Sequence, residues 1–182
     1  MPLPAIDFSP YRLAEFRPEH TAQVVRIIED CYAEYAEAIE LDTLDRDLLE
    51  IENVYAGPRA MFRVLLDPGP AGGRPVGTVA FKMTGPCEGE LKRVFLERAC
   101  RGRGLGGKLV LSALDWARER GCRTAHIWSD VLYATAHRLY RRLGAEDTGT
   151  IRLLGGRNQV YERYLRLALP AGPAERRSTG TT

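Results

Sequence analysis

The stretch that decides the fold of this 182-residue chain is Arg101-Gly102-Arg103-Gly104-Leu105-Gly106-Gly107. Glycine lets the backbone turn tightly and brings bare N–H groups close to a ligand. An amphipathic helix is expected to begin inside this run, with an apolar face made of Leu105, Leu109, Ala113, Trp116 and Ala117. The first amides of a helix are unpaired, and its N-terminus carries a partial positive charge. The run therefore predicts a site for a phosphate or pyrophosphate.

Two common phosphate-binding motifs match part of this run, and the first is the P-loop. A P-loop requires the pattern GxxxxGK followed by serine or threonine, and residues 102–108 fit that pattern up to the lysine. Leu109 then stands where a magnesium-binding hydroxyl is needed. This mismatch disfavours a nucleoside triphosphatase.

The second motif is the dinucleotide-binding fingerprint GxGxxG. It matches Gly102, Gly104 and Gly107, and Asp130 follows at about the 20-residue distance expected of a ribose ligand. The first strand of such a fold is apolar directly up to the first glycine. Here the segment 90–96 carries three charged side chains, and a polar loop follows it. A dinucleotide-dependent oxidoreductase is therefore the less favoured alternative.

A third pattern, Arg/Gln-x-x-Gly-x-Gly/Ala after a strand, is filled by Arg101, Gly104 and Gly106. It resembles the acyl-CoA pyrophosphate loop of the GNAT superfamily of N-acetyltransferases. The segment 90–96 (ELKRVFL) resembles the fourth strand of these enzymes, and residues 136–145 (AHRLYRRLGA) resemble their A-x-x-L-Y-x-x-x-G-F segment. The resemblance implies an acyl-CoA-dependent N-acetyltransferase. Such an enzyme transfers an acetyl group from acetyl-CoA to a primary amine by direct attack within a ternary complex.

The resemblance also implies roles for individual residues. Alkylammonium groups have pKa values near about 10, so a base must deprotonate the acceptor, and Glu90 is the expected base. Tyr140 is the expected acid for the departing thiolate. The alternatives are a solvent-facing glutamate that is paired with Lys92 or Arg93, and a tyrosine that only packs.

The same resemblance implies how acetyl-CoA is held. The pantetheine arm is expected to lie along the backbone of Val94, Phe95 and Leu96 like an added strand. The pyrophosphate is expected to bind the amides of the run 101–107, with charge-assisted contacts from Arg101 and Arg103.

Two positions depart from the pattern of the superfamily. Tyr133 stands where many members have an asparagine that contacts pantetheine, and Ala145 replaces the usual aromatic residue. His137 lies beside the motif on a helix that carries several arginines. We expect it to be an exposed side chain rather than a base.

The acceptor is expected to be a cationic amine, either on a small molecule or on a peptide or protein. The resemblance implies that the first two helices and their loop form the acceptor wall. Between residues 29 and 52, Arg46 is the only base among the acids Glu29, Asp30, Glu34, Glu37, Glu40, Asp42, Asp45, Asp47, Glu50 and Glu52. Such a wall attracts cations, and Tyr32, Glu34 and Tyr35 are the expected ligand contacts. The alternative is a pair of solvated helical faces.

Hydrophobic periodicity predicts the element order β-α-α-β-β-β-α-β-α-β-β. The expected strands are 11–17, 61–66, 76–83, 90–96, 124–129, 150–154 and 159–169, and the expected helices are 21–37, 45–55, 105–120 and 134–143. Because a helix connects strands 90–96 and 124–129, these two should be parallel in an otherwise mostly antiparallel sheet. The fold class is α/β of the α+β type, with a GNAT-like mixed sheet that is flanked by helices.

Composition indicates one ordinary globular domain at residues 1–169 and a disordered tail at 170–182. The net charge of +2 predicts no nucleic-acid partner, and no apolar run predicts a membrane span or a signal peptide. The four cysteines form no metal-binding pattern, so we expect no metal and free thiols in a reducing cytoplasm. The closing strands offer an edge for a homodimer. A non-catalytic acyl-CoA sensor stays open as an alternative function.

Overall fold

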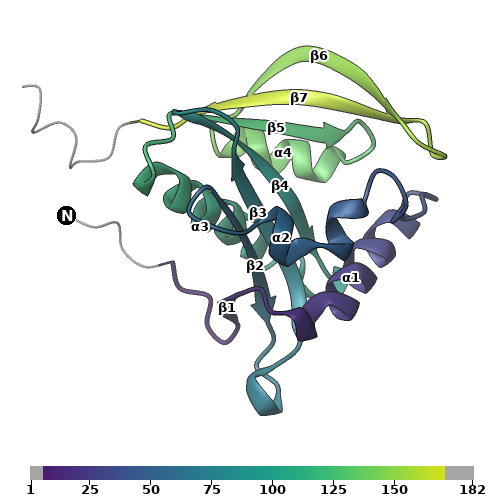
Figure 1. The fold of residues 1–182 in the computed structure, drawn as a ribbon, viewed down its shortest axis with the longest axis vertical. Coiled ribbons are helices and arrows are strands. Elements are labelled where there is room, and N and C mark those ends of the chain that lie inside the picture. Colours follow the sequence, from purple (N-terminus) through teal and green to yellow (C-terminus); the bar gives the residue numbers. More distant parts are fainter. Residues whose placement is uncertain (1–5, 171–182) are drawn as a thin grey trace, which may run out of the picture.

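The computed structural model describes residues 6–170, so the predictions for residues 1–5 and 171–182 lie outside the described part of the chain. The strands are β1 (Arg12–Glu15), β2 (Ala60–Leu66), β3 (Pro75–Met83), β4 (Glu88–Leu96), β5 (Thr124–Asp130), β6 (Glu146–Gly155) and β7 (Val160–Ala168). The α-helices are α1 (Thr21–Ala33), α2 (Ile51–Val54), α3 (Leu105–Glu119) and α4 (Ala134–Arg142) (Figure 1). This order confirms the predicted one.

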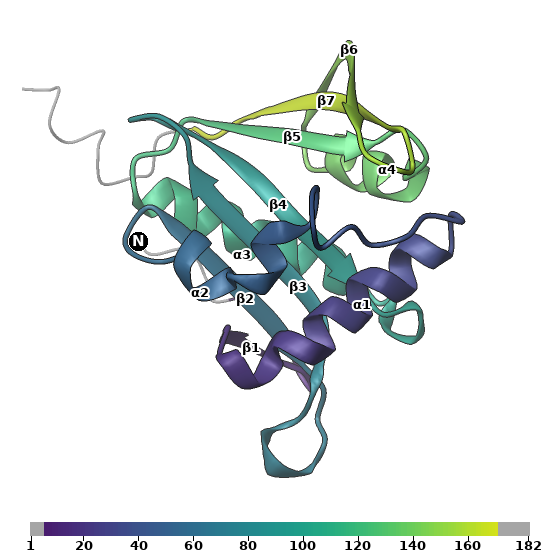
Figure 2. The same cartoon turned by 45° about the vertical axis from the view of Figure 1, so that its right-hand side comes forward.

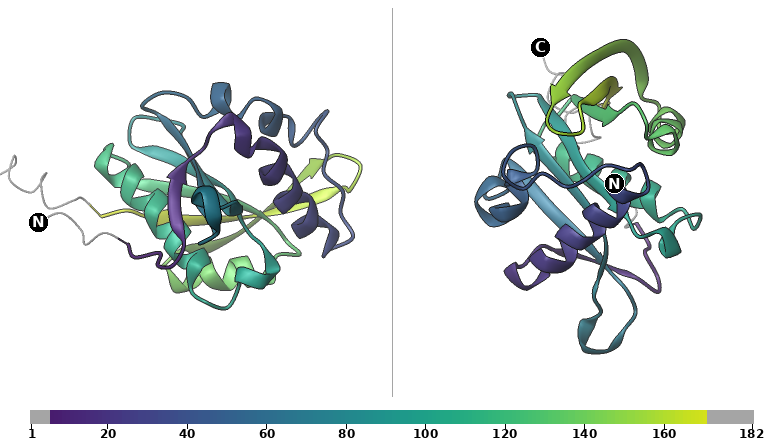
Figure 3. Two further views of the ribbon diagram at one scale, coloured as in Figure 1. Left: turned by 90° about the horizontal axis from the view of Figure 1, so that it is seen from below. Right: turned by 90° about the vertical axis from the view of Figure 1, so that its right-hand side faces the viewer.

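The seven strands form one sheet in the order β1-β2-β3-β4-β5-β7-β6. All neighbours are antiparallel except β4 and β5, which are parallel as predicted. The helices lie on both faces of the sheet (Figure 3). The predicted fold class is therefore confirmed.

Two cores hold the helices against the sheet. On one face, Val24 and Ile28 of α1 and Ile51 of α2 are buried against β2 and β3. On the other face, α3 is buried along its predicted apolar stripe, and Tyr140 of α4 belongs to the same core. None of the helices within residues 6–170 combines the length and the apolar content that crossing a membrane would need.

The parallel strands β4 and β5 separate soon after they begin (Figure 2). They pair only from Glu88–Thr124 to Glu90–His126, and no strand within the described residues pairs with the β5-facing edge of β4 beyond that point. A bulge in β4 accompanies the separation: Arg93 has a positive φ of 52°, and its carbonyl accepts a 2.7 Å hydrogen bond from the hydroxyl of Thr78. The separation opens the middle of the sheet.

Three predicted elements differ most from the structure. Helix α1 ends at Ala33 instead of continuing to 37, because Ala36 adopts a positive φ of 59° and the amide of Glu37 turns back to the carbonyl of Tyr32. The predicted helix 45–55 divides at Glu50, where φ is −133°, into a 3₁₀ turn and the short α2. Strand β6 begins at Glu146, earlier than predicted, because β7 pairs with it over most of its length.

Candidate active site

Two cavities meet where β4 and β5 separate. The larger, here called the cleft, measures about 690 Å³ and lies between the glycine run 101–107, the end of β4 and helix α4. The smaller, here called the chamber, measures about 250 Å³. It is bounded by the loop after α1, by β4, by the end of β5 and by the paired strands β6 and β7. Both cavities are lined by Val94, Phe95, Tyr133, Ala136 and Tyr140. Two ligands, one in each cavity, would therefore touch at these five residues, which are here called the junction.

The glycine run forms the end of the cleft. Gly102 and Gly104 have φ values of 77° and 76°, which favour glycine, and Gly104 caps the N-terminus of α3. The first helical hydrogen bond runs from the amide of Lys108 to the carbonyl of Gly104. No amide from residue 102 to residue 107 donates to an acceptor within the described chain. This loop thus presents a row of free donors to an anion, as the sequence indicated.

Arg101 lines the cleft, but its guanidinium is already engaged within the protein. Its guanidinium donates to the carbonyl of Leu96 at 2.8 Å and to both carboxylate oxygens of Glu34 at 2.7 Å. The hydrogen bond from Arg101 holds the pKa of Glu34 below its usual range. Arg101 therefore ties the glycine run to α1, and its charge is already balanced.

Two further arginines belong to the segments around the cleft. Arg103 is part of the glycine run but does not line the cleft, and among residues 6–170 it bonds to the hydroxyl of Tyr11 at 3.1 Å. Arg142, from the last turn of α4, lines the cleft and has no ionic partner within residues 6–170. Sequence reasoning missed Arg142, because nothing in its local pattern distinguishes it from the neighbouring arginines of that helix.

Tyr140 stands between the two cavities with its side chain almost completely buried. Within the described chain, its hydroxyl has no hydrogen-bond partner, although it lines both cavities. Burial raises the pKa of this phenol, so that it keeps its proton at neutral pH. A free, protonated donor at the junction is suited to act as an acid.

Glu90 lies on the wall of the chamber, at the point where the two strands part. Its carboxylate accepts a hydrogen bond from the ammonium of Lys92 at 2.9 Å, and both side chains are partly exposed. In the strand register it stands opposite His126, whose ring nitrogens contact Tyr164 at 2.7 Å and Glu88 at 3.3 Å. Glu90 is therefore paired with Lys92, as the alternative prediction stated, and it also lines the chamber.

A second carboxylate centre lies near the junction. The hydroxyl of Tyr133 donates to Glu37 at 2.8 Å, and Tyr35 packs on the ring of Tyr133 with 4.8 Å between the centroids. Burial raises the pKa of Glu37, and the neighbouring Asp130 raises it further. Tyr133, at the position of the usual asparagine, thus holds a carboxylate instead.

The expected acceptor contacts are divided between the cavities. Tyr32 lines the chamber and Tyr35 lines the cleft. Glu34 lines neither of them, because its carboxylate is directed to Arg101. Glu37 reaches the chamber instead, since the early end of α1 turns the chain there.

A buried ion cluster fixes the loop after α1 to the bulge of β4. The guanidinium of Arg93 bonds to Asp45 at 2.7 Å and to both oxygens of Asp47, one of them at 3.0 Å. The hydroxyls of Tyr32 and Tyr55 donate to the same two carboxylates at 3.1 and 2.7 Å. Burial favours the neutral form of Asp47, but the hydrogen bonds and charge of Arg93 outweigh it and lower the pKa of this carboxyl.

This cluster corrects the expectation of an acidic wall with a single base. Arg93, Arg101 and Arg157 are distant in sequence, yet each reaches an acid of the segment 29–52. Much of the counted negative charge is therefore neutralised inside the protein. A local count of charges cannot detect such long-range pairs.

His137 is buried, not exposed. Only 4% of its surface is accessible, and its Nε2 has no hydrogen-bond partner among residues 6–170. Burial lowers its pKa, with further contributions from Arg163 and Arg141, so the ring is neutral. The buried face of α4 contains His137 and Tyr140, whereas the arginines lie on the other side.

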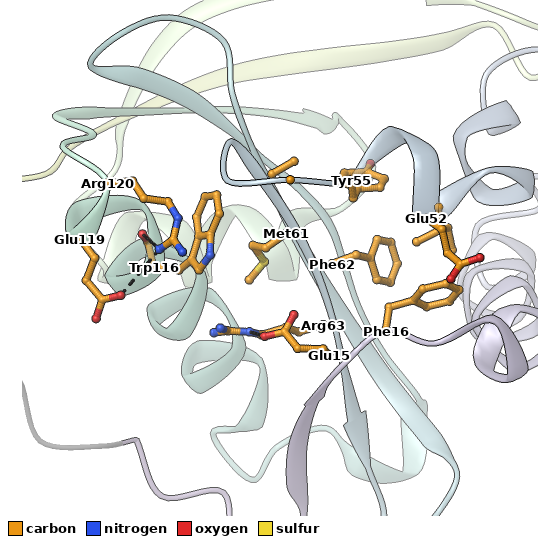
Figure 4. A pocket seen from close by; sticks show the side chains of 13 residues that line it. Glu15, Phe16, Glu52, Tyr55, Met61, Phe62, Arg63, Trp116, Glu119 and Arg120 are labelled. Carbon is orange, nitrogen blue, oxygen red and sulfur yellow. Dashed lines mark hydrogen bonds and ion pairs between the residues drawn. The ribbon is translucent and has the colours of Figure 1, made fainter.

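A third cavity, of about 510 Å³, lies at the end of β2 that β1 does not cover (Figure 4). Its side chains include Trp116, Tyr55 and Phe62. Arg120 lies over the ring of Trp116 at 4.1 Å, and Arg63 is paired with Glu15 at 2.7 Å. This cavity shares no lining residue with the cleft or the chamber, so it is separate from the candidate site.

Comparison with known proteins identifies the family. Residues 21–145 match the acetyltransferase (GNAT) family. The uncharacterized N-acetyltransferase YjgM of Escherichia coli K12 is 29% identical over 126 residues, which cover 68% of this chain and 74% of that protein. An uncharacterized N-acetyltransferase of Methanocaldococcus jannaschii is 33% identical over 63 residues, which cover 35% of this chain and only 28% of that protein. The chain therefore belongs to the acetyltransferase (GNAT) family, and the prediction of an N-acetyltransferase is confirmed.

Solved structures show the same fold. An acetyltransferase from Streptococcus agalactiae 2603 has a TM-score of 0.75 at 22% identity, covering 89% of this chain and all of that one (100%). The protein yncA of Salmonella typhimurium, solved with its cofactor acetyl-CoA, has a TM-score of 0.67 at 18% identity and covers 90% of this chain and 96% of that one.

The ion cluster predicts how stability depends on pH. Asp47→Asn removes a buried ion pair and should lower the free energy of unfolding at pH 7 by about 3 kcal/mol. The pKa of Asp47 is lowered in the folded state, so its stabilisation is present above the unfolded pKa of about 3.9 and is lost as pH falls through the lower folded value. Urea unfolding from pH 7 to pH 2.5 should show the two proteins converging below about pH 4.

Asp30→Asn is the matched control, because Asp30 and Arg26 are about 3.9 Å apart and both mostly exposed. It should change the unfolding free energy by less than about 0.5 kcal/mol. A difference between wild type and Asp47→Asn that stayed constant down to pH 2.5 would contradict the assignment.

Proposed function

We propose that this enzyme transfers an acetyl group from acetyl-CoA, bound in the cleft, to a primary amine, bound in the chamber, by direct attack within a ternary complex. The observation that carries this proposal is the meeting of the two cavities at Tyr140, a buried tyrosine with a free hydroxyl. The fold shared with yncA, which was solved with acetyl-CoA, supports the choice of donor.

The cleft has the features that acetyl-CoA requires. The free amides of residues 102–107 would hold the pyrophosphate at the N-terminus of α3, and Arg142 and Arg103 supply nearby positive charge. The unpaired edge of β4 from Val94 to Leu96 offers backbone groups to the pantetheine arm. The thioester would then lie at the junction, beside Tyr140.

The chemistry follows from this placement. Glu90 accepts a proton from the ammonium group of the acceptor, and the freed nitrogen lone pair attacks the thioester carbonyl. The nitrogen of the tetrahedral intermediate loses its second proton to solvent, the carbon–sulfur bond breaks as the intermediate collapses, and Tyr140 donates its proton to the departing thiolate. Solvent returns a proton to Tyr140 and removes the one held by Glu90, which restores the starting state.

The charge of the chamber favours a cationic acceptor. It is lined by three basic side chains, Lys92, Arg93 and Arg152, and by the acidic side chains Glu37, Glu40, Asp45, Glu90, Asp130 and Glu162. Excess negative charge in a cavity with low-dielectric walls raises the local concentration of cations. We propose that Glu37 and Asp130, near the junction, receive the ammonium group.

The donor is tested by ligand-induced stabilisation. A ligand that binds only the native state raises its melting temperature, so acetyl-CoA should stabilise the protein and NAD and ATP should not. Thermal unfolding with each ligand at the same concentration measures this. Release of free thiol from acetyl-CoA, followed with a panel of amines, then tests transfer. Stabilisation by NAD alone would contradict the proposed donor.

Tyr140 is tested by removing only its hydroxyl. Tyr140→Phe should lower kcat about 100-fold and leave the affinity for acetyl-CoA nearly unchanged, because the phenyl ring keeps its packing. Steady-state kinetics and acetyl-CoA titration measure the two quantities. Tyr161→Phe, which alters an exposed tyrosine outside both cavities, is the matched control. If Tyr140→Phe kept the wild-type kcat, Tyr140 would contribute packing only and would not be the acid.

Glu90 is tested by removing only its charge. Glu90→Gln should lower kcat/KM about 100-fold at a fixed pH, because an amide cannot accept the proton of the acceptor. Glu88→Gln alters the same strand outside the chamber and should keep the wild-type kcat/KM. If Glu90→Gln kept that value too, Glu37 would be the next candidate for the base.

A further inference from the structure

The turn between β6 and β7 is bonded to the loop after α1, as the neighbouring positions of these segments in Figure 3 indicate. Glu40 accepts hydrogen bonds from the amides of Arg157 at 2.7 Å and Asn158 at 3.3 Å. The side-chain amide of Asn158 donates to the carbonyl of Ala38 at 2.8 Å and accepts from its amide at 3.3 Å. These four residues are here called the latch.

The latch is closely fitted. Glu40 is only 2% exposed, and its second oxygen accepts from Thr43 at 2.9 Å. Gly156 has a positive φ of 75°, and a Cβ there would lie 2.6 Å from Leu44 and 2.7 Å from Glu40. The backbone of the turn therefore lies so close to the loop that a side chain at position 156 would not fit.

The latch lies over the chamber. Glu40 and Asn158 are among the residues that line it, so the loop and the turn are joined at the edge of the space where the acceptor would lie. Because these two segments are hydrogen-bonded to each other, an extended polypeptide could not pass between them without breaking the latch.

The volume of the chamber limits what fits beneath the latch. Cavities for drug-sized ligands are usually larger than the 250 Å³ of the chamber, at about 300–1,000 Å³. A short amine matches this volume, whereas the residues that flank a peptide amine would have to lie outside it.

The charges in the chamber suit a single ammonium group. Asp45 is bonded to Arg93, Glu162 to Arg152 and Glu90 to Lys92, and Glu40 is occupied by the amides of the latch. Among these acids, Glu37 and Asp130 have neither a cationic partner within residues 6–170 nor a place in the latch, and they are neighbours. The remaining lining includes the apolar side chains of Phe95, Leu154, Trp128 and Val160.

We infer that the latch makes this enzyme specific for a small primary monoamine with an apolar body, and excludes peptide and protein amines. This inference rests on the proposed acetyl transfer and names the class of its acceptor. It assigns the latch a role in specificity rather than in chemistry.

The test compares acceptors of three kinds with acetyl-CoA. The probes are butylamine and 2-phenylethylamine, then spermidine, and then two ten-residue peptides, one with a free N-terminus and one with a single lysine and a blocked N-terminus. The monoamines should have kcat/KM values at least about 10-fold above those of spermidine and both peptides. A peptide or spermidine acetylated as efficiently as the monoamines would overturn the inference.

A variant with an open latch sharpens the test. Glu40→Gln combined with Asn158→Ala should raise the kcat/KM of the peptides relative to the monoamines several-fold, with the KM for acetyl-CoA unchanged. Asn158→Ala alone is measured as well, in case the double variant does not fold. Glu146→Gln, at the far end of β6 in an exposed pair with Arg166, should keep the wild-type ratio. Folded latch variants that also kept the wild-type ratio would contradict the role of the latch.

Binding measured without turnover separates this inference from the proposed function. The chain has two tryptophans, and Trp116→Phe leaves Trp128, on the chamber wall, as the only one. With coenzyme A present, its fluorescence should respond to the monoamines and not to the peptides. If the monoamines bind but no amine is acetylated, the proposed function fails and the inferred selectivity stands. If the peptides bind as well as the monoamines, the inference fails.

Discussion

The geometry of the site depends on the charge of Arg93, which is buried beside two aspartates. Charges removed from water are costly unless they are paired and hydrogen-bonded, and Arg93 meets Asp45 and Asp47 in the loop after α1. The backbone of the same residue forms the bulge of β4, next to the point where β5 leaves it. One interaction thus fixes the opening in the sheet and the wall of the chamber in a single arrangement.

Features carried by local pattern could be predicted from the sequence. The glycine run, the apolar stripe of α3 and the positions of Glu90 and Tyr140 depend on short spacings, and the structure brings these segments together around the cleft and the chamber. The element order and the parallel pair also follow from local periodicity and connection rules. The family comparison agrees with the same segments.

Features that depend on distant partners could not be predicted. The early end of α1 requires a positive φ at Ala36, a conformation that alanine rarely adopts. The engagement of Arg101 with Glu34 crosses 67 positions, and that of Arg93 with Asp47 crosses 46. The burial of His137 depends on which face of α4 meets the sheet. No pattern within a few residues of these positions indicates their partners.

The loop after α1 has a further property that follows from the sequence separation of its contacts. It is held at one end by Arg93, 46 to 48 positions away, and at the other by Arg157 and Asn158, 117 to 120 positions away. Contacts between distant positions form only after the chain between them has been ordered, because loop closure costs entropy. The wall of the chamber is therefore completed late in folding. A nascent chain that still lacks β7 contains the glycine run and the sequence of α3 but cannot yet form the complete acceptor chamber.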